Sequence, residues 1–152
     1  PIHCELQEVN LKAGPSYEAL SYVWGSPTRT HPISCNGLTL LVTPNCRDAL
    51  IHLRRRVTKR TLWIDAICID QGDSEGSKKE RNNQILQMGE VYKTARRVVI
   101  WLGTADQGIC KPFSQKTFEL YRSVDFSQIV DNEWFKRVWT IQEAAFARHI
   151  IL

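Results

Sequence analysis

The fold prediction starts from residues 17–24, with the sequence YEALSYVW. This segment is rich in aromatic and β-compatible residues and ends at the turn-forming sequence GSP (residues 25–27), so it predicts a β-strand. Two further apolar runs, at residues 61–69 and 98–102, predict core strands. The first of these is nearly continuous, which is typical of a strand covered on both faces.

Apolar residues at helical spacing predict helices between these strands. Thr43 and Pro44 are typical of an N-cap followed by proline in the first turn, and Ser77 with Glu80 matches a capping box. The expected buried stripes consist of Cys46, Ala49, Leu50 and Leu53 in the first helix, Ile85, Met88, Tyr92 and Ala95 in the second, and Phe135, Val138, Ile141 and Ala145 in the last. We also expect a short helix at residues 116–124 and a final strand at residues 149–152.

The dipeptide Asn36-Gly37, between two apolar segments, predicts a type I′ hairpin at residues 33–42. Strands that alternate with helices predict an α/β fold, with a mainly parallel central sheet, flanking helices, right-handed crossovers and the hairpin at the periphery. The chain lacks an initial methionine and ends on an apolar run, so we expect residues 1–152 to be a single domain cut from a longer protein.

Composition excludes several classes of protein. The chain has 152 residues, a net charge of +4 and 43% hydrophobic residues, and no uninterrupted apolar run is long enough for a transmembrane helix. Its basic clusters accompany no nucleic-acid motif, so we expect neither nucleic acid nor a membrane as a partner. Five cysteines without zinc-ligand spacing favour a reducing compartment, and we expect a cytoplasmic location with no metal and no bound cofactor.

Ligands of open α/β sheets bind beyond the carboxyl ends of the strands, which directs attention to the turns after Trp24, Ile69 and Leu102. The dinucleotide fingerprint, the P-loop and the nucleophile elbow are all missing from the sequence. Asp65 lies inside a predicted buried strand, where a carboxylate must be paired or hydrogen-bonded. It is either a structural acid bonded to backbone amides or arginine, or a pocket acid.

Glu143 follows Trp139 by four residues, so the two side chains share a face of the expected last helix. One interpretation places an aromatic wall beside a pocket carboxylate. In that case we expect Glu143 to lie near the carboxyl ends of the first two strands, close to Trp24, Gly25 or the turn at Asp70 and Gln71. The other places Glu143 on the helix surface, paired with Lys136 or Arg148.

Four blocks of the sequence resemble the fungal heterokaryon incompatibility (HET) domain family. In order they are YEALSYVWG (residues 17–25), LWIDAICIDQ (residues 62–71), VY with VIWLG (residues 91–92 and 99–103) and WFKRVWTIQE (residues 134–143). One position departs from the family pattern, because Asp70 stands where asparagine is more frequent.

The resemblance implies a module of filamentous fungi that mediates non-self recognition and triggers programmed cell death. The family is distantly similar to Toll/interleukin-1 receptor (TIR) domains, which implies a flavodoxin-like sheet. Some TIR domains cleave NAD with a glutamate in a Trp-x-x-x-Glu-like block, and this carries over to Glu143 as a catalytic residue. The substrate-facing positions implied by this resemblance and by the strand ends are Ser21, Tyr22, Trp24, Gly25, Asp70, Gln71 and Trp139.

Two functions therefore remain open. In one, the chain is a signalling module that acts through self-association, protein partners and other domains of its parent chain. In the other, it is an NAD-consuming enzyme, with NAD as its substrate, whose glutamate stabilises an oxocarbenium-like ribosyl centre.

Overall fold

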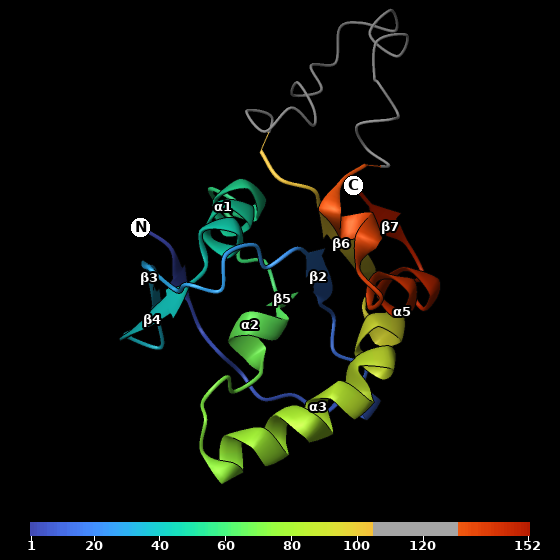
Figure 1. Cartoon of the computed structure of the whole chain (residues 1–152), viewed down its shortest axis with the longest axis horizontal. Helices are drawn as coiled ribbons and strands as arrows, with labels where there is room; N and C mark the ends of the chain where they lie inside the picture. The colour runs from blue at the N-terminus through green and yellow to red at the C-terminus, as the bar shows by residue number, and fades with distance from the viewer. Residues whose placement is uncertain (105–130) are drawn as a thin grey trace, which may run out of the picture.

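The computed structural model describes residues 1–104 and 131–152, and the expected helix at residues 116–124 lies outside them. The central sheet has four strands in the order β5-β2-β6-β7, and each neighbouring pair is parallel (Figure 1). Its strands are β2 (Glu18–Tyr22), β5 (Leu62–Trp63), β6 (Arg97–Trp101) and β7 (Ile150–Ile151). The segments predicted as strands at residues 17–24, 61–69 and 98–102 thus contribute adjacent and parallel strands, which confirms the α/β prediction. The expected final strand is confirmed as β7.

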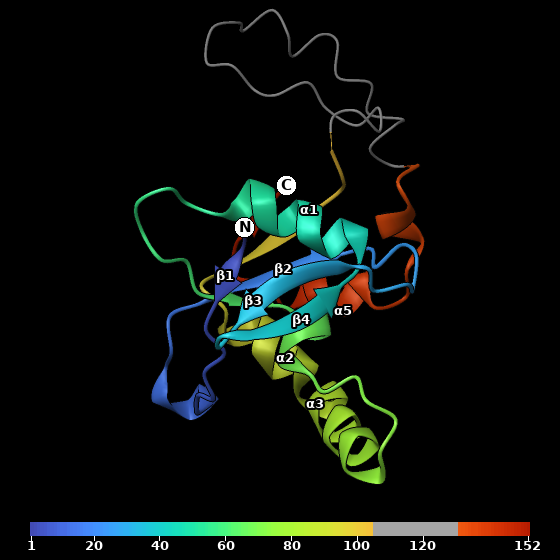
Figure 2. The ribbon, with the colours of Figure 1, turned by 90° about the vertical axis from the view of Figure 1, so that its left-hand side faces the viewer.

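A second, smaller sheet has the order β1-β3-β4. Its strands are β1 (His3–Cys4), β3 (His31–Cys35) and β4 (Leu38–Val42). The predicted hairpin is confirmed, with Asn36 at φ 50° and Gly37 at φ 79° in the turn. Figure 2 shows this hairpin facing the viewer, with helix α1 (Pro44–Leu53) above it.

The two faces of β2 pack against different helices, because alternate side chains of a strand point to opposite sides. On one face, Ala19 joins a core cluster with helix α3 (Glu75–Thr94) and Trp134. On the other, Leu20 and Tyr22 join residues of α1, the hairpin and helix α2 (Asp65–Cys68). All five residues of β2 are buried, so it is the centre of the fold.

Helix α1 begins as predicted, with the Thr43 side chain accepting a hydrogen bond from the Cys46 N–H and Pro44 in the first turn. A short 3₁₀ helix, η1 (Leu11–Ala13), precedes β2. Within residues 1–104 and 131–152, no helix combines the length and apolar character needed to span a bilayer.

The predicted strand at residues 61–69 is wrong after Trp63, because the chain turns into α2 at Asp65. The Asp65 carboxylate accepts a hydrogen bond from the Ala66 N–H at 2.7 Å, and the Cys68 N–H donates to the Ile64 carbonyl. A continuous apolar run fits a buried helical turn as well as a buried strand, and these local hydrogen bonds favour the turn.

The expected start of α3 is also wrong. Ser74 is its N-cap and accepts a hydrogen bond from the Ser77 N–H at 3.0 Å, so Ser77 and Glu80 form no capping box. The buried stripe is confirmed for Met88, Tyr92 and Ala95, whereas Ile85 is 38% exposed.

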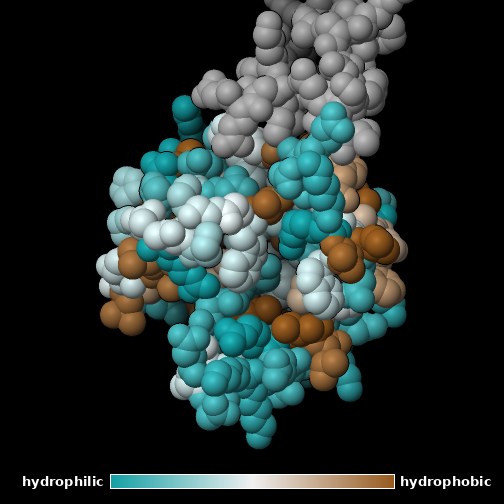
Figure 3. Space-filling view, viewed as in Figure 1, coloured by the Kyte–Doolittle hydropathy of each residue, from teal (hydrophilic) through white to brown (hydrophobic). Residues whose placement is uncertain are grey.

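The expected last helix is divided into the 3₁₀ helix η4 (Glu133–Lys136) and the helix α5 (Thr140–Ala145). Its predicted apolar stripe is wrong: Val138 is 79% and Ile141 70% exposed, while Trp134 is buried. The break at Arg137, which has extended backbone angles, rotates the two helices relative to each other. Apolar side chains therefore gather on the surface over α5 and the adjoining end of α3 (Figure 3).

Glu18, at the amino end of β2, is buried beneath three arginines. Its carboxylate accepts hydrogen bonds from Arg60 at 2.6 Å, Arg96 at 2.6 Å and Arg97 at 2.6 and 2.9 Å. Burial raises the pKa of a carboxyl group, but here the hydrogen bonds from Arg97, Arg96 and Arg60 outweigh it and lower the pKa of Glu18 to about 2. Arg60 also donates to the Leu53 carbonyl at 2.8 Å, so this cluster joins β2, β6 and the end of α1.

Replacement of this carboxylate should destabilise the fold strongly. We expect Glu18→Gln to lower the free energy of unfolding by about 3–5 kcal/mol, because it leaves buried guanidinium charge without its partner. Because the pKa of Glu18 is lowered, its contribution is complete above the ordinary value of 4.5 and is lost as the pH falls toward about 2. Urea unfolding of the wild-type chain and the Glu18→Gln variant, at pH values from about 2 to above 4.5, measures both the loss of stability and its dependence on pH.

The matched control is Glu5→Gln, which removes an exposed ion pair with Lys59. This variant should change the free energy of unfolding by less than about 1 kcal/mol. Equal losses in the two variants would contradict the assignment of Glu18.

Candidate functional site

The carboxyl group of Glu143 lies inside the protein at the carboxyl half of β2, with only 1% of the residue exposed. It accepts a hydrogen bond from the hydroxyl group of Ser21, which in turn accepts one from the indole N–H of Trp134 at 2.6 Å. Arg137 lies 3.5 Å from the other carboxylate oxygen. These four residues, Ser21, Trp134, Arg137 and Glu143, are called the Glu143 network below.

Local hydrogen bonds place the segment that carries this network. The Asn132 side chain caps η4 by accepting from the Trp134 N–H at 2.9 Å, and it donates to the Leu102 carbonyl beyond β6 at 3.0 Å. Arg137 donates to the Tyr22 carbonyl at the end of β2 at 2.6 Å. The segment before α5 is therefore fixed against the carboxyl ends of both central strands.

The protonation of Glu143 is set by competing influences. Burial raises its pKa, the hydrogen bond from Ser21 and the charge of Arg137 lower it, and the nearby charge of Asp65 raises it, with a net increase above the ordinary value. The carboxyl group therefore holds a proton at higher pH than an exposed glutamate does. A carboxyl group of this kind can donate or accept a proton. In its ionised form it can also stabilise a positive charge that develops in a site with little water.

Asp65 is half-buried and hydrogen-bonded. It accepts a hydrogen bond from the Trp24 indole N–H at 2.8 Å in addition to that from the Ala66 N–H. Burial raises its pKa, while the bonds from Trp24 and Ala66 and the charge of Arg137 lower it, leaving a net increase. The charge of Arg137 thus acts on both Glu143 and Asp65, which brings the two acids into one electrostatic environment.

The side chains of Asp70 and Gln71 form hydrogen bonds that stabilise the turn before α3. The exposed Asp70 carboxylate accepts from the Ser77 hydroxyl group at 2.7 Å and from the Gly72 N–H at 2.8 Å, and these bonds lower its pKa. Gln71 donates to the Asp65 carbonyl at 3.2 Å. Among the described residues, no hydrogen bond or ion pair joins either residue to Glu143, so the expected closeness of this turn to Glu143 has no contact to support it.

The side chains of the other predicted positions are dispersed. Tyr22 points into the core under α1, where its hydroxyl group has no hydrogen-bond partner among the described residues. Trp24 lies beneath the guanidinium group of Arg29, 6.0 Å from the ring centre. Gly25 has φ 69°, a backbone conformation that suits glycine in the turn after β2.

Trp139 does not form the expected wall beside Glu143, because it is 47% exposed whereas Glu143 is buried. Its backbone carbonyl instead accepts from the Glu143 N–H at 3.1 Å at the start of α5. The surface alternative for Glu143 is also wrong, since its ion-pair partner is Arg137, and Lys136 pairs with Glu133 at 2.6 Å.

The sequence prediction missed Trp134 and Arg137. Both lie in the block at residues 134–143, and Arg137 precedes Glu143 by six residues, a spacing that one continuous helix would place on different faces. The break between η4 and α5 brings them together.

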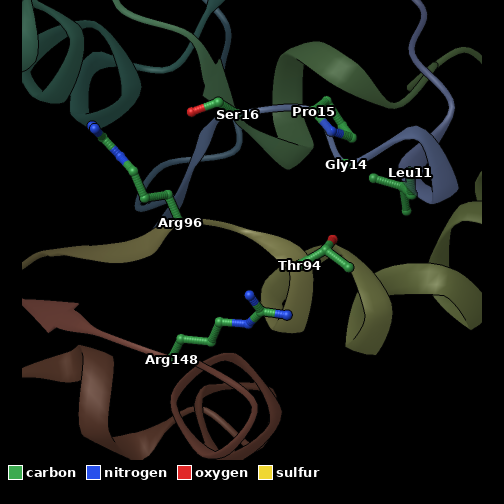
Figure 4. Close-up of a pocket in the computed structure, with 7 residues that line it drawn as sticks. All are labelled: Leu11, Gly14, Pro15, Ser16, Thr94, Arg96 and Arg148. Atoms are coloured by element: carbon green, nitrogen blue, oxygen red, sulfur yellow. The ribbon is translucent and has the colours of Figure 1, made fainter.

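A shallow cavity of about 320 Å³ lies at the amino edge of the central sheet, away from these residues. It is lined by Leu11, Gly14, Pro15, Ser16, Thr94, Arg96 and Arg148 (Figure 4). Arg148 extends toward Thr94 at the end of α3, and Arg96 is already bonded to Glu18. None of the predicted site residues lines this cavity. Within the described ranges, no cluster of three or more His, Cys, Asp or Glu side chains is arranged to hold a metal ion.

Removal of the Asp65 carboxylate should destabilise the chain. We expect Asp65→Ala to lower the free energy of unfolding by about 1–3 kcal/mol, because it leaves the Trp24 indole N–H and the Ala66 N–H without their acceptor. Urea unfolding measures the change. Asp73→Ala, at an exposed position in the turn before α3, is the control and should be nearly neutral. An Asp65→Ala variant as stable as this control would show that the two hydrogen bonds do not stabilise the fold.

Comparisons with known proteins give a consistent result. The model of the family described as heterokaryon incompatibility protein (HET) matches residues 17–143. The heterokaryon incompatibility protein 6, OR allele, of Neurospora crassa is 30% identical over an alignment of 201 positions that covers 93% of this chain and 29% of that relative. The chain thus spans less than a third of the length of this relative, and no solved structure matches it. The family match covers most of the chain, from the start of the central sheet to Glu143, and the chain therefore belongs to the heterokaryon incompatibility (HET) family.

Proposed function

We propose that this chain acts in fungal heterokaryon incompatibility, as a cytoplasmic signalling module that triggers programmed cell death after non-self recognition. The observation that carries the proposal is the family match over residues 17–143, which contains every residue of the Glu143 network. The name of the Neurospora crassa relative supports the same role. The relative is much longer than this chain, which supports a module that works with other domains of a parent protein.

Signalling by contact requires a surface for a protein partner or a second copy of the chain. Val138 and Ile141 are largely exposed on the segment around α5, and Phe146 at its end is 46% exposed. The Glu143 network fixes this segment against β2, so a rearrangement of the network would change the surface that the segment presents. In contact signalling the buried residues act only by holding this surface in place, so a variant that keeps the hydrogen bond from Ser21 to residue 143 retains the function.

The second candidate function is that of a TIR-like NAD glycohydrolase. The specific observation in its favour is a buried carboxyl group with a raised pKa at the carboxyl half of the central strand. In this proposal the N-glycosidic bond of NAD breaks, nicotinamide leaves with the bonding electron pair, and Glu143 stabilises the cationic ribosyl carbon until water attacks it. The products are nicotinamide, ADP-ribose and a proton.

Such an enzyme would require the segment around α5 to move. Glu143 is enclosed by Ser21 and Arg137, so a substrate reaches its carboxyl group only when Arg137 leaves Tyr22. The substrate would then lie at the carboxyl ends of the strands, near Trp24 and Gly25. Ser21, Tyr22, Asp70, Gln71 and Trp139 remain the other proposed substrate-binding positions.

Expression of the chain in a filamentous fungus tests both functions through Glu143→Gln. This variant preserves the size of the side chain and an oxygen acceptor for Ser21, but it cannot carry the negative charge. We expect the wild-type chain to kill cells. If it signals by contact, a folded Glu143→Gln variant still kills and NAD content is unchanged. If it is a hydrolase, the variant abolishes both nicotinamide release and killing.

Two controls make the result interpretable. Glu133→Gln alters an exposed glutamate of the same segment and should retain killing in either case. Ile141→Ser alters an exposed apolar residue of α5, and contact signalling predicts that it abolishes killing while the fold is retained. A wild-type chain that leaves cells alive would contradict both proposed functions.

A further inference from the structure

Two of the cysteines lie directly opposite each other on neighbouring strands. Cys4 of β1 and Cys35 of β3 are register partners in a parallel pair. Hydrogen bonds on both sides fix this register, because the Ser34 N–H donates to the Ile2 carbonyl at 3.0 Å and the Asn36 N–H donates to the Cys4 carbonyl at 3.1 Å. The pairing of the two cysteines is therefore set by the backbone.

Their side chains are placed within reach of each other. Register partners on adjacent strands project from the same face of a sheet, and the strands lie about 4.8 Å apart. This spacing falls within the Cα separations of about 4.4–6.8 Å that disulfide bonds join. Burial first, and then the hydrogen bond and charge of the Cys35 thiol, raise the pKa of Cys4 to about 12, so the two sulfur atoms influence each other directly.

The surroundings allow the pair to react. Both thiols are half-buried, whereas Cys46 is completely buried in the core. Strand β1 has only two residues, His3 and Cys4, and it lies at the edge of the smaller sheet, where it pairs with β3 alone, so it can shift by the small distance that a covalent bond requires. The Cys4 thiol donates a hydrogen bond to the Ser34 carbonyl at 3.4 Å, and this bond must break when Cys4 loses its proton. The Cys68 sulfur instead accepts a hydrogen bond, from the Ile64 N–H at 3.4 Å.

We propose that Cys4 and Cys35 form a reversible disulfide bond that ties β1 to the β3–β4 hairpin. The oxidant is a small disulfide such as oxidised glutathione. The Cys35 thiolate attacks one sulfur of glutathione disulfide and releases a glutathione thiolate. The Cys4 thiol then loses its proton and attacks the Cys35 sulfur of the mixed disulfide, releasing a second glutathione. The two cysteines together lose two electrons and two protons, and one glutathione disulfide becomes two glutathione thiols.

The bond would stabilise the smaller sheet. It closes the loop formed by residues 5–34, which includes β2, so the unfolded chain loses conformational freedom. In the folded chain, Ile2 and Cys4 pack against the core cluster that contains Leu20, so a fixed β1 would also fix the outer edge of that cluster. In a reducing environment the pair returns to two thiols.

The experiment equilibrates the purified chain with mixtures of reduced and oxidised glutathione, blocks the remaining thiols and maps the disulfides by peptide mass spectrometry. Chymotrypsin separates Cys35 from Cys46, because Leu38, Leu40 and Leu41 lie between them. We expect a cross-link between the Cys4 and Cys35 peptides, and a higher midpoint of thermal unfolding for the oxidised chain than for the reduced chain.

The matched variants are Cys35→Ser, which should abolish both the cross-link and the shift in midpoint, and Cys68→Ser, which should retain both. Cys110→Ser serves the same purpose for the fifth cysteine of the sequence. Cross-links that join Cys4 to Cys46, Cys68 or Cys110, or glutathione adducts at both Cys4 and Cys35 without a cross-link, would overturn the proposal.

Discussion

A buried charge inside a protein must be paired or neutralised, and this constraint acts at both ends of the central strand β2. At its amino end, the Glu18 carboxylate is paired with Arg60, Arg96 and Arg97, which fixes the start of β6 and the segment before β5. Toward its carboxyl end, Ser21 is bonded to the buried Glu143. The pKa values of the two acids shift in opposite directions. Hydrogen bonds from three guanidinium groups lower the pKa of Glu18, whereas burial is the largest influence on Glu143 and raises its pKa.

The same constraint explains why the site and the fold are hard to separate in this chain. The Glu143 network connects α5 to the sheet, and it also contains the proposed catalytic residue of the NAD glycohydrolase. A variant that removes the Glu143 side chain leaves the Ser21 hydroxyl group without its acceptor and Arg137 without its ion-pair partner, so a loss of activity could reflect a loss of structure. Charge-removing variants of the same shape, compared with Glu133→Gln, distinguish these effects.

Much of the fold could be predicted from the sequence, because alternating strands and helices, the Asn36-Gly37 turn and the Thr43-Pro44 cap are local signals. The secondary structure of the apolar run at residues 61–69 could not be predicted from the sequence, because hydrogen bonds of Asp65 and Ile64 favour a helical turn over a strand there. The place of Glu143 beside Ser21 depends on the break at Arg137, and apolar spacing in the block at residues 134–143 indicated a continuous helix instead. Its closeness to β2 was expected, but Trp134 and Arg137 as its partners were not.

The most direct test of the two buried carboxyl groups is a pH titration followed by NMR of the side-chain carboxyl carbons, with Glu18→Gln and Glu143→Gln used to assign their signals. Signals of Glu18 should titrate near pH 2, and those of Glu143 should titrate above the ordinary glutamate value of 4.5. Titration of Glu18 and Glu143 at the same pH, or a Glu143 signal that titrates below 4.5, would contradict the claim that the two buried acids along β2 have opposite electrostatic environments.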